Sequence, residues 1–272
     1  MSLEPVHAHD DVALRDRDAR PPRGLDADDD TLERKVDKLR VRLATLQEAL
    51  YAESKQTLLV VLQARDAGGK DGTIRRVFSL VNPQGCVVRS FKQPTPEELA
   101  HDFLWRIHAA VPSHGMIGIF NRSHYEDVLA VRVHKLVPKA TWKARFDQIN
   151  EFERMLTQNG VTILKFFLHV SREEQRVRLL ERLTDPTKNW KFEAGDLKER
   201  DLWDDYTHAY RDVFRKCSTK WAPWYIVPAD RKHARDFLVL ETIVSALARM
   251  RPRYPKADPK TLDLMKDLRK PK

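Results

Sequence analysis

TLLVVLQARDAGGKDGT, residues 57–73, joins a short apolar run to a turn that contains two glycines. An unbroken apolar run of this length, bounded by turn residues, is typical of a strand that a parallel sheet buries on both faces. The turn at 64–70 precedes a predicted helix at 71–80. A buried strand, a glycine-bearing turn and a helix in that order indicate a protein of the α/β class.

Four more apolar runs repeat this strand pattern along the chain, and predicted helices separate them. Thr95, Pro96 and Glu98 place a capping box at the start of one of these helices. The alternation predicts an α/β fold with a doubly wound, parallel five-stranded sheet, whose ligands bind at the carboxyl ends of the strands. The predicted strands are 57–63, 85–90, 116–120, 161–170 and 224–227, and the helices are 32–50, 71–80, 95–110, a short one near 125, 139–158, 172–183, 197–216 and 236–249.

The chain of 272 residues is long enough for one large domain or two small ones. Residues 1–30 are polar and aperiodic, which predicts a disordered or loosely attached arm. Residues 31–250 form the predicted domain, and 251–272 are a Pro- and Lys-rich tail. The helix at 32–50 carries a stripe with steps of three and four, so it either packs on its own domain or forms a subunit interface: Leu32, Val36, Leu39, Leu43, Leu46 and Leu50.

Charge and composition narrow the class of protein. The net charge is +9, and because the first 30 residues hold nine acids and four arginines, the rest carry +14. Such a body either binds a polyanion or is a soluble basic protein without such a partner. Cys86 and Cys217 are predicted to be reduced thiols of a cytoplasmic protein. We expect no signal peptide and no membrane span, since no apolar run approaches about 18 residues.

The turn after the first strand resembles a P-loop. Converging backbone amides and the helix start bind phosphate, and Lys70 supplies a mobile positive charge. Ala64 stands where the motif has its first glycine, and Asp71 where it has a metal-binding hydroxyl. Asp66 would repel bare phosphates, so we expect it to hold Mg²⁺. The predicted phosphate-binding residues are Ala67, Gly68, Gly69, Lys70, Asp71 and Gly72.

The loops after the next two strands carry further candidates. Arg122 follows the third strand, where a guanidinium can fork onto phosphate oxygens. Glu126 either belongs to the site or serves as a helix-start acid. His124, without a second ligand nearby in sequence, is predicted to be structural. After the second strand, Phe91 is either a core residue or a base-stacking one, with Lys92 meeting a phosphate.

The segment after the fourth strand is rich in arginine and lysine. Arg178 and Arg182 lie four residues apart, on one helix face. Lys188 and Lys191 lie in the following loop. A basic helix–loop–helix at about 172–216 is predicted to be a lid over the phosphate site, the alternative being a solvated basic face.

Three motifs in this order resemble polyphosphate kinase family 2, the polyphosphate:nucleotide phosphotransferases. They are ARDAGGKDG at 64–72, FNRSHYEDV at 120–128 and DPTKNWKF at 185–192, and WAPWY at 221–225 and PAD at 228–230 fit as well. The resemblance covers about residues 32–250. It implies a P-loop kinase fold related to thymidylate kinase, with a helical lid and usually an oligomeric assembly. It also implies Mg²⁺-dependent phosphoryl transfer between inorganic polyphosphate and a nucleotide.

The resemblance also implies roles for single residues. Asp66 would bind Mg²⁺ and position the attacking nucleotide phosphate, and Lys70, Arg122 and Arg182 complete the catalytic set. Asn121 stands where many members have Asp, and we assign it with Asp66 to the metal. The motif at 121–127 resembles the subgroup that accepts nucleoside mono- and diphosphates, AMP and ADP or GMP and GDP. Polyphosphate binding is further assigned to Arg178, Lys188 and Lys191, and nucleotide binding to Phe91, Lys92, Asn121, Arg122 and Glu126.

Three functions therefore compete at this point. The leading one is a polyphosphate-dependent nucleotide kinase that uses Mg²⁺, with Mn²⁺ as the alternative ion, and forms a homodimer or homotetramer. The second is an ATP-dependent nucleotide or small-molecule kinase. The third is a nucleic-acid-binding protein on a P-loop scaffold, for which the chain offers no recognisable motif. We expect polyphosphate and nucleotides as partners, and neither nucleic acid nor membrane.

Overall fold

The computed structural model describes residues 2–7, 10–25, 30–193 and 195–269. Its core is one parallel sheet with the strand order β2-β3-β1-β4-β5. The strands are β1 (Thr57–Ala64), β2 (Cys86–Ser90), β3 (Ile117–Asn121), β4 (Val161–His169) and β5 (Trp224–Pro228). Every residue of the central β1 is buried, as its apolar run predicts. The predicted α/β five-stranded parallel sheet is therefore confirmed.

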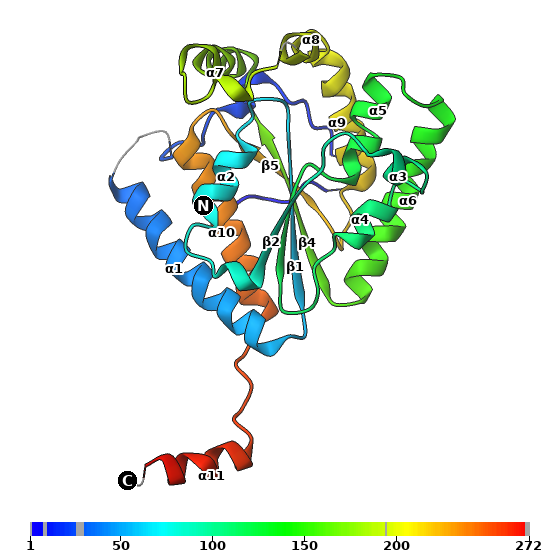
Figure 1. Cartoon of the computed structure of the whole chain (residues 1–272). Coiled ribbons are helices and arrows are strands. Elements are labelled where there is room, and N and C mark those ends of the chain that lie inside the picture. Colours follow the sequence, from blue (N-terminus) through cyan, green and yellow to red (C-terminus); the bar gives the residue numbers. More distant parts are fainter. Residues whose placement is uncertain (1, 8–9, 26–29, 194, 270–272) are drawn as a thin grey trace.

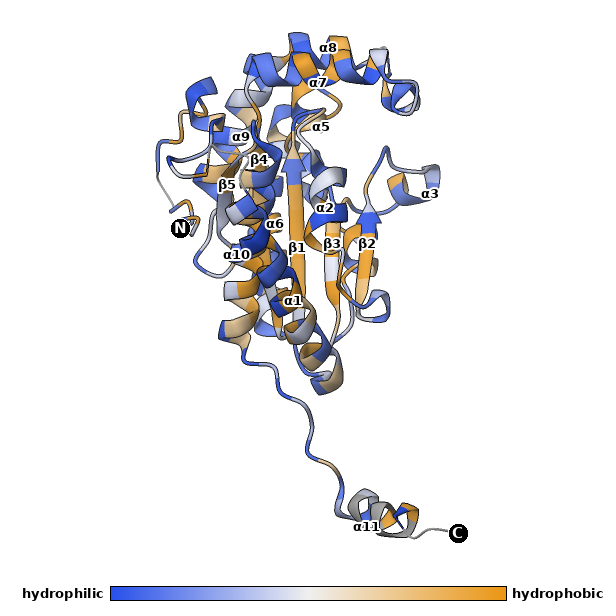
Figure 2. Ribbon diagram, turned by 90° about the vertical axis from the view of Figure 1, so that its left-hand side faces the viewer, coloured by the Kyte–Doolittle hydropathy of each residue, from blue (hydrophilic) through white to orange (hydrophobic). Residues whose placement is uncertain are grey.

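Helices cover both faces of this sheet (Figure 1). One layer holds α1 (Asp30–Glu53), α2 (Lys70–Val77) and α10 (Lys232–Met250), and the other α6 (Lys139–Gln158) and α9 (Trp203–Cys217). Figure 2 shows the first layer from the front, with the apolar strands behind it. The shorter elements are η1 (Asp16–Ala19), η2 (Pro83–Gly85), α3 (Pro96–Leu99), α4 (Trp105–Ala109), η3 (His124–Asp127), α5 (Ala130–Val133), α7 (Arg172–Thr184), η4 (Asn189–Lys191), α8 (Gly195–Asp201) and α11 (Pro259–Leu268).

The heptad-like stripe lies on α1 and faces the domain itself. Five of its six leucine and valine positions are buried, and Leu39 packs against the same core cluster. The partner helix is α10, from the other end of the chain. Burial of each such side chain contributes about 1.5–3 kcal/mol, so packing on its own domain accounts for the stripe.

The predicted helix at 95–110 is wrong in its length. The capping box forms: the Thr95 hydroxyl accepts from the Glu98 amide at 3.2 Å, and the Glu98 carboxylate accepts from the Thr95 amide at 2.8 Å. However, α3 ends at Leu99, and α4 starts only at Trp105. The Asp102 side chain accepts the Leu104 amide at 2.9 Å. This local hydrogen bond competes with the helical ladder, which explains the break.

The predicted helix at 197–216 is also divided, into α8 and α9. The Leu202 amide donates to the carbonyl of Glu199 at 3.2 Å, an i to i−3 bond that tightens the last turn of α8. The chain then changes direction and α9 begins at Trp203. A continuous apolar pattern does not show such a change of direction.

Most of the described residues of the first thirty are exposed or half-buried, but a few of them anchor this segment to the domain. The Val6 amide donates to the carbonyl of Trp224 at 2.8 Å, and the Asp230 amide donates to that of Ala19 at 3.1 Å. Val6, Leu14 and Ala19 are buried. A few apolar residues in a polar stretch therefore hold it against the edge of the sheet at β5.

The chain after Arg251 leaves the body of the domain. A stretch without regular structure leads to α11, and Figures 1 and 2 both show this helix standing away from the sheet. Its Leu264 and Leu268 are exposed. The sequence analysis does not predict this helix. Among the described helices, none is long and apolar enough to cross a membrane.

Candidate active site

The loop between β1 and α2 has the tight backbone that a P-loop needs. Ala67 has φ 57° and Gly69 has φ 98°, so both lie in the left-handed region. A Cβ at Gly68 would lie 2.5 Å from the Cβ of Ala64, so only glycine fits there. The loop leads directly into the N-terminus of α2 at the carboxyl edge of the sheet. Backbone amides and the helix dipole there favour a bound anion.

Lys70, the first residue of α2, folds back across this loop. Its Nζ donates to the carbonyl of Ala64 at 3.1 Å. Burial lowers the pKa of Lys70 to about 8, and the neighbouring Arg122 acts in the same direction, against the opposing effect of Asp66. A bound phosphate would favour the charged ammonium. Lys70 is therefore a cation that an anionic ligand stabilises.

Arg122 lies beside the P-loop, as the order of the strands predicts. β3 is the neighbour of β1 in the sheet, and the Arg122 amide donates to the carbonyl of Leu62 at 3.0 Å. Its backbone has φ 63°, a strained value for a residue with a side chain. Its Nη2 donates to Oδ1 of Asp66 at 2.9 Å. Two of the predicted catalytic residues, from separate loops, are thus in direct contact.

Glu126 acts on the same arginine. Burial opposes the charge of Arg122, but the carboxylates of Glu126 and Asp66 outweigh it and raise the pKa of the guanidinium. Arg122 is therefore fully charged at neutral pH. Glu126 therefore lies near Arg122, and its membership of the site stays a prediction.

Asn121 and Asp71 form a second contact between the same two loops. The Asn121 side-chain amide donates to Oδ1 of Asp71 at 2.8 Å. On its other side, Oδ2 of Asp71 lies 3.8 Å from Nζ of Lys191. Asp71 is 67% exposed, so these contacts compete with water and are readily exchanged for a ligand.

Phe91 and Lys92 differ in their surroundings. Phe91 is buried and its ring meets the ring of Phe120 edge-on, with centroids 4.9 Å apart. Arg106 lies over the Phe91 ring at 5.5 Å. Lys92 is exposed. The structure thus gives Phe91 the role of a core residue, and its contact with a base stays a prediction.

The predicted lid contacts the P-loop through α7. The Gln175 side chain donates to the backbone carbonyl of Asp66 at 3.0 Å. Arg178 is buried, and its guanidinium donates to the carbonyls of Ala67 at 3.2 Å and Ala229 at 2.6 Å. These bonds tie the P-loop to the loop after β5. This geometry supports a role for Arg178 in holding the P-loop, and its contact with polyphosphate stays a prediction.

The other basic residues of the segment lie farther out. Arg182 is 3.4 Å from Asp196 of α8, and Lys188 is 2.7 Å from Asp185. Lys191 is the one of these three that the ion-pair distances connect to the P-loop, through Asp71. Arg182 and Lys188 are thus paired with acids of this same segment, and their contact with a phosphate stays a prediction.

His124 is structural, as predicted. Its Nε2 lies 3.2 Å from Oε1 of Glu153, which also accepts the Tyr125 hydroxyl at 2.9 Å. Lys165, from the middle of β4, donates to Glu153 at 2.6 Å, to the Tyr125 hydroxyl at 2.7 Å and to the carbonyl of Cys217 at 2.7 Å. This buried network anchors the residues that directly follow Arg122.

The sequence analysis misses two residues next to the P-loop, Arg235 and Asp236 of α10. A Cβ at Gly69 would overlap Nη1 of Arg235. Both residues are buried, and both nitrogens Nε and Nη2 of Arg235 donate to Oδ1 of Asp236. A signal was present: this charged pair stands directly before the apolar run FLVL at 237–240.

The acids of the site suit a divalent cation only in part. Among the described residues, no group of three or more His, Cys, Asp or Glu could hold a metal ion. Mg²⁺, however, usually takes one or two carboxylates and completes its shell with phosphate oxygens and water. Asp66 and Asp71 at the phosphate-binding loop fit that pattern, with the ligand supplying the remaining oxygens.

Comparisons with known proteins agree with this arrangement. The model of the family described as polyphosphate kinase 2 matches residues 26–255. The AMP/ADP-polyphosphate phosphotransferase of Meiothermus ruber is 56% identical over 220 residues, 81% of this chain and 82% of the relative. The ADP-polyphosphate phosphotransferase of Rhodopseudomonas palustris is 47% identical over 230 residues, 80% of each chain.

The fold agrees as well. The crystal structure of polyphosphate kinase 2 from Arthrobacter aurescens TC1 superimposes with a TM-score of 0.82 and 40% sequence identity, over 94% of this chain and 95% of that one. The family match covers the sheet, the P-loop, the Arg122 loop and the predicted lid. The chain therefore belongs to the polyphosphate kinase 2 family, with its α/β P-loop kinase fold.

Proposed function

We propose that this chain transfers phosphoryl groups between inorganic polyphosphate and adenosine mono- and diphosphates, with Mg²⁺ as the required ion. The observation that carries the proposal is the contact of Asp66 with Arg122 at 2.9 Å beside the loop that holds Lys70. It brings an acid, an arginine and a lysine together at the carboxyl edge of the sheet. The two relatives, an AMP/ADP- and an ADP-polyphosphate phosphotransferase, support adenine nucleotides as acceptors.

The chemistry needs positioning and charge neutralisation more than a protein nucleophile. Lys70 and Arg122 would neutralise the charge that develops on the transferring phosphoryl group. Asp66 would hold Mg²⁺ and orient the attacking nucleotide phosphate. Asn121 would contribute an amide oxygen to the metal or to the nucleotide, in place of a carboxylate.

The segment at about 172–216 serves as the lid in this proposal. Its contacts with the P-loop through Gln175 and Lys191 support that role. A closed lid excludes water, which would otherwise accept the phosphoryl group and hydrolyse polyphosphate. Arg182 would clamp the transferring phosphate from the lid, and Lys188 would bind the polyphosphate chain.

We also propose that the protein is cytoplasmic and forms a homodimer or a homotetramer.

Product analysis tests this function directly. The purified protein is incubated with polyphosphate, Mg²⁺ and one of AMP, ADP, GMP or GDP, and the nucleotides are separated by chromatography. We expect ADP and ATP from AMP, and ATP from ADP, with less product from GMP and GDP. Omission of Mg²⁺, with a chelator present, should abolish the reaction.

Two controls separate the alternatives. Product from AMP or a sugar with ATP as the sole donor, and none with polyphosphate, would establish an ATP-dependent kinase instead. Retention of labelled RNA or DNA at moderate salt, without any nucleotide product, would establish a nucleic-acid-binding protein.

A further inference from the structure

The space behind the P-loop is filled by a side chain that the site described above does not use. Gly69 has φ 98°, and a Cβ on it would overlap Nη1 of Arg235. The same Cβ would lie 3.6 Å from Nη1 of Arg178, and one on Gly72 would lie 3.6 Å from Nη2 of Arg235. The Arg235 guanidinium therefore lies directly against two glycines of the loop.

A buried carboxylate fixes this guanidinium. Oδ1 of Asp236 accepts from Nε of Arg235 at 2.8 Å and from its Nη2 at 2.7 Å. Oδ2 of the same carboxylate lies 2.9 Å from Nε of Arg76 of α2. Arg235 is 2% exposed and Asp236 is 1% exposed. One buried acid thus joins α10 to the helix that begins at Lys70.

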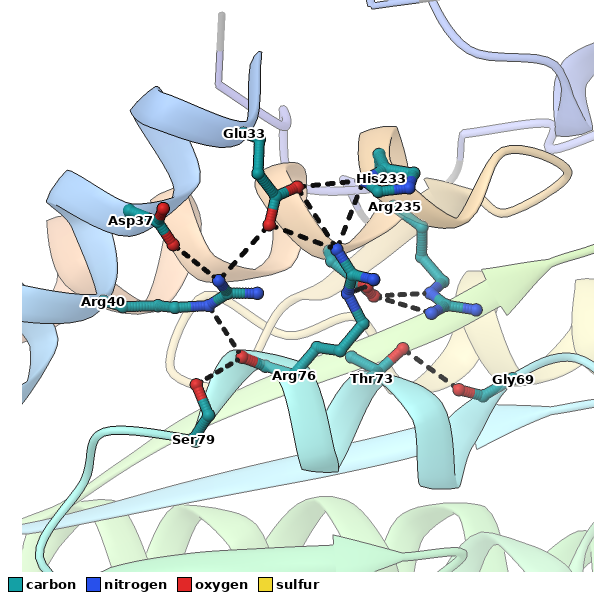
Figure 3. A network of polar contacts seen from close by, with 10 residues as sticks. Glu33, Asp37, Arg40, Gly69, Thr73, Arg76, Ser79, His233 and Arg235 are labelled. Carbon is teal, nitrogen blue, oxygen red and sulfur yellow. Dashed lines mark hydrogen bonds and ion pairs between the residues drawn. The ribbon is translucent and has the colours of Figure 1, made fainter. Parts of the chain in front are cut away.

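The outer end of this network reaches α1. Glu33 lies 3.3 Å from Nη2 of Arg76, 3.4 Å from Nη1 of Arg40 and 3.0 Å from Nδ1 of His233. Nε of Arg40 also donates to the backbone carbonyl of Arg76 at 2.9 Å. Figure 3 shows Glu33 and Arg40 on one side of the Arg76 guanidinium, with His233, Arg235 and the P-loop residue Gly69 on the other. Helix α1 therefore supports α2 through these charged side chains.

The hydrogen bonds leave one nitrogen of Arg235 uncommitted. Asp236 takes Nε and Nη2, while Nη1, the atom next to Gly69, has no hydrogen-bond partner among the residues that the structure describes. Asp236 is also shared with Arg76, and Arg178 lies close by. Two guanidinium groups, those of Arg235 and Arg178, therefore lie against Gly69 at the back of the loop.

We propose that Arg235 is a positioning residue of the phosphate-binding loop, which Asp236 holds against Gly69. The guanidinium occupies the place of a side chain at position 69 and keeps the loop in its left-handed turn, so that its amides converge on the donor phosphate. The inference rests on the proposed function, since the donor is taken to be polyphosphate. It extends that function to α10, which does not contact the transferring group.

Arg235→Lys is the main test, because it keeps the charge and loses the planar fork. Arg235→Met removes the charge at similar length and leaves Asp236 paired with Arg76. The matched control is Arg154→Lys on α6, which makes the same substitution in an exposed pair outside the lid, where Arg154 lies 3.9 Å from Glu151. For each protein, kcat and the KM for polyphosphate and for ADP are measured. The Kd for tripolyphosphate is measured by calorimetry, and the Tm without ligand by circular dichroism.

We expect the KM for polyphosphate and the Kd for tripolyphosphate to rise about tenfold in Arg235→Lys and more in Arg235→Met, because small shifts of a binding loop are costly. The KM for ADP should change less than twofold, and Arg154→Lys should match the wild type. A lower Tm with unchanged polyphosphate KM and Kd would overturn the proposal, as would a rise confined to the KM for ADP. If the wild type neither binds polyphosphate nor uses it, the proposed function itself fails.

Discussion

Two ion pairs of this molecule, Arg122 with Asp66 and Lys165 with Glu153, have different roles. Arg122 meets Asp66 at 2.9 Å, with their side chains 41% and 23% exposed. Lys165 meets Glu153 at 2.6 Å, and both are fully buried. The Glu153 carboxylate also accepts the hydroxyl of Tyr125, three residues after Arg122. Distance alone therefore does not distinguish a structural pair from a reactive one.

The surroundings of the two pairs make the difference. Inside the protein, the three donors of Lys165 all find acceptors, and a charge in such a place must be paired. At the sheet edge, Arg122 and Asp66 remain open to solvent, so a phosphate or a metal ion can replace either partner at small cost. The inner pair holds the loop, and the outer pair is the one that we propose meets the ligand.

The largest effect should follow from Asp66→Asn. The variant keeps the shape of the side chain but loses a hard anionic ligand for Mg²⁺, so we expect kcat to fall by about 10³ or more with Tm within a few degrees of the wild type. Steady-state ATP formation measures kcat, and thermal unfolding measures Tm. Near-normal turnover at saturating Mg²⁺ would remove Asp66 from the metal site.

Arg122→Ala tests the other half of the outer pair, and Lys70→Ala the cation beside it. Each charge is proposed to act on the transferring phosphoryl group, so kcat should fall by about 10²–10³. Separate measurement of kcat and of the KM for nucleotide shows whether each charge acts in catalysis or in binding. If Arg122→Ala raised only that KM, Arg122 would belong to ground-state binding rather than catalysis.

The inner pair should respond in stability instead. Glu153→Gln leaves Lys165 buried without a counter-charge, which should cost about 3–5 kcal/mol in the free energy of unfolding. Urea denaturation gives this value, and kcat at a temperature where the variant is folded should stay near that of the wild type. The double variant with Lys165→Met should recover much of the loss. A large loss of kcat without destabilisation would contradict the contrast between the two pairs.

Alkaline pH should weaken polyphosphate binding through Lys70. Its pKa is lowered to about 8 by burial, with Arg122 adding to the effect, so the ligand-free protein loses this charge as the pH rises through 8. The KM for polyphosphate should therefore rise above pH 8, by up to about tenfold per pH unit. Lys70→Arg stays charged and should not show this rise.

The lowered pKa of Lys70 also makes the stability of the fold depend on pH, and here a rise in pH is favourable. Since the folded protein holds the Lys70 proton less tightly than the unfolded chain, burial of the ammonium opposes folding below pH 8. That opposition is relieved as the pH rises from about 8 to the ordinary value of 10.5. In Lys70→Arg this part of the pH dependence of unfolding should disappear, which denaturation at pH 7 and 9 can measure.

The smallest effect is expected from the double variant Lys188→Ala and Lys191→Ala. Both side chains are largely exposed, so each contributes mainly long-range attraction to a polyanion. The KM for polyphosphate should rise by a few-fold, more than the KM for nucleotide, and its dependence on salt should become flatter. Unchanged KM and salt dependence would return both lysines to a solvated basic surface.

Local patterns made much of the fold predictable. The apolar runs place all five strands to within two residues, and the prediction for α6 is the same as the observed helix. The glycines and Lys70 mark the P-loop because a tight turn and a mobile cation need those residue types. The contact of Asp66 with Arg122 follows from the order of the strands, since loops at neighbouring carboxyl ends must meet.

The breaks within predicted helices could not be seen in this way. The turn at Leu202 and the restart after Asp102 depend on single hydrogen bonds, which leave no periodic signal. The anchoring of the described residues among the first thirty depends on isolated apolar side chains such as Val6 and Leu14, which a polar composition conceals.

By itself the sequence determined the class of the fold, the P-loop and the charged residues of the site, because hydrophobic period and turn chemistry are local properties of the chain. The tertiary structure alone decided which arginines face the ligand edge and which are turned inward. Arg178 lies beneath the loop because it donates to two backbone carbonyls, and Arg235 lies there because it donates to Asp236. A buried guanidinium must find such acceptors wherever the fold supplies them, and those partners lie far away in the sequence.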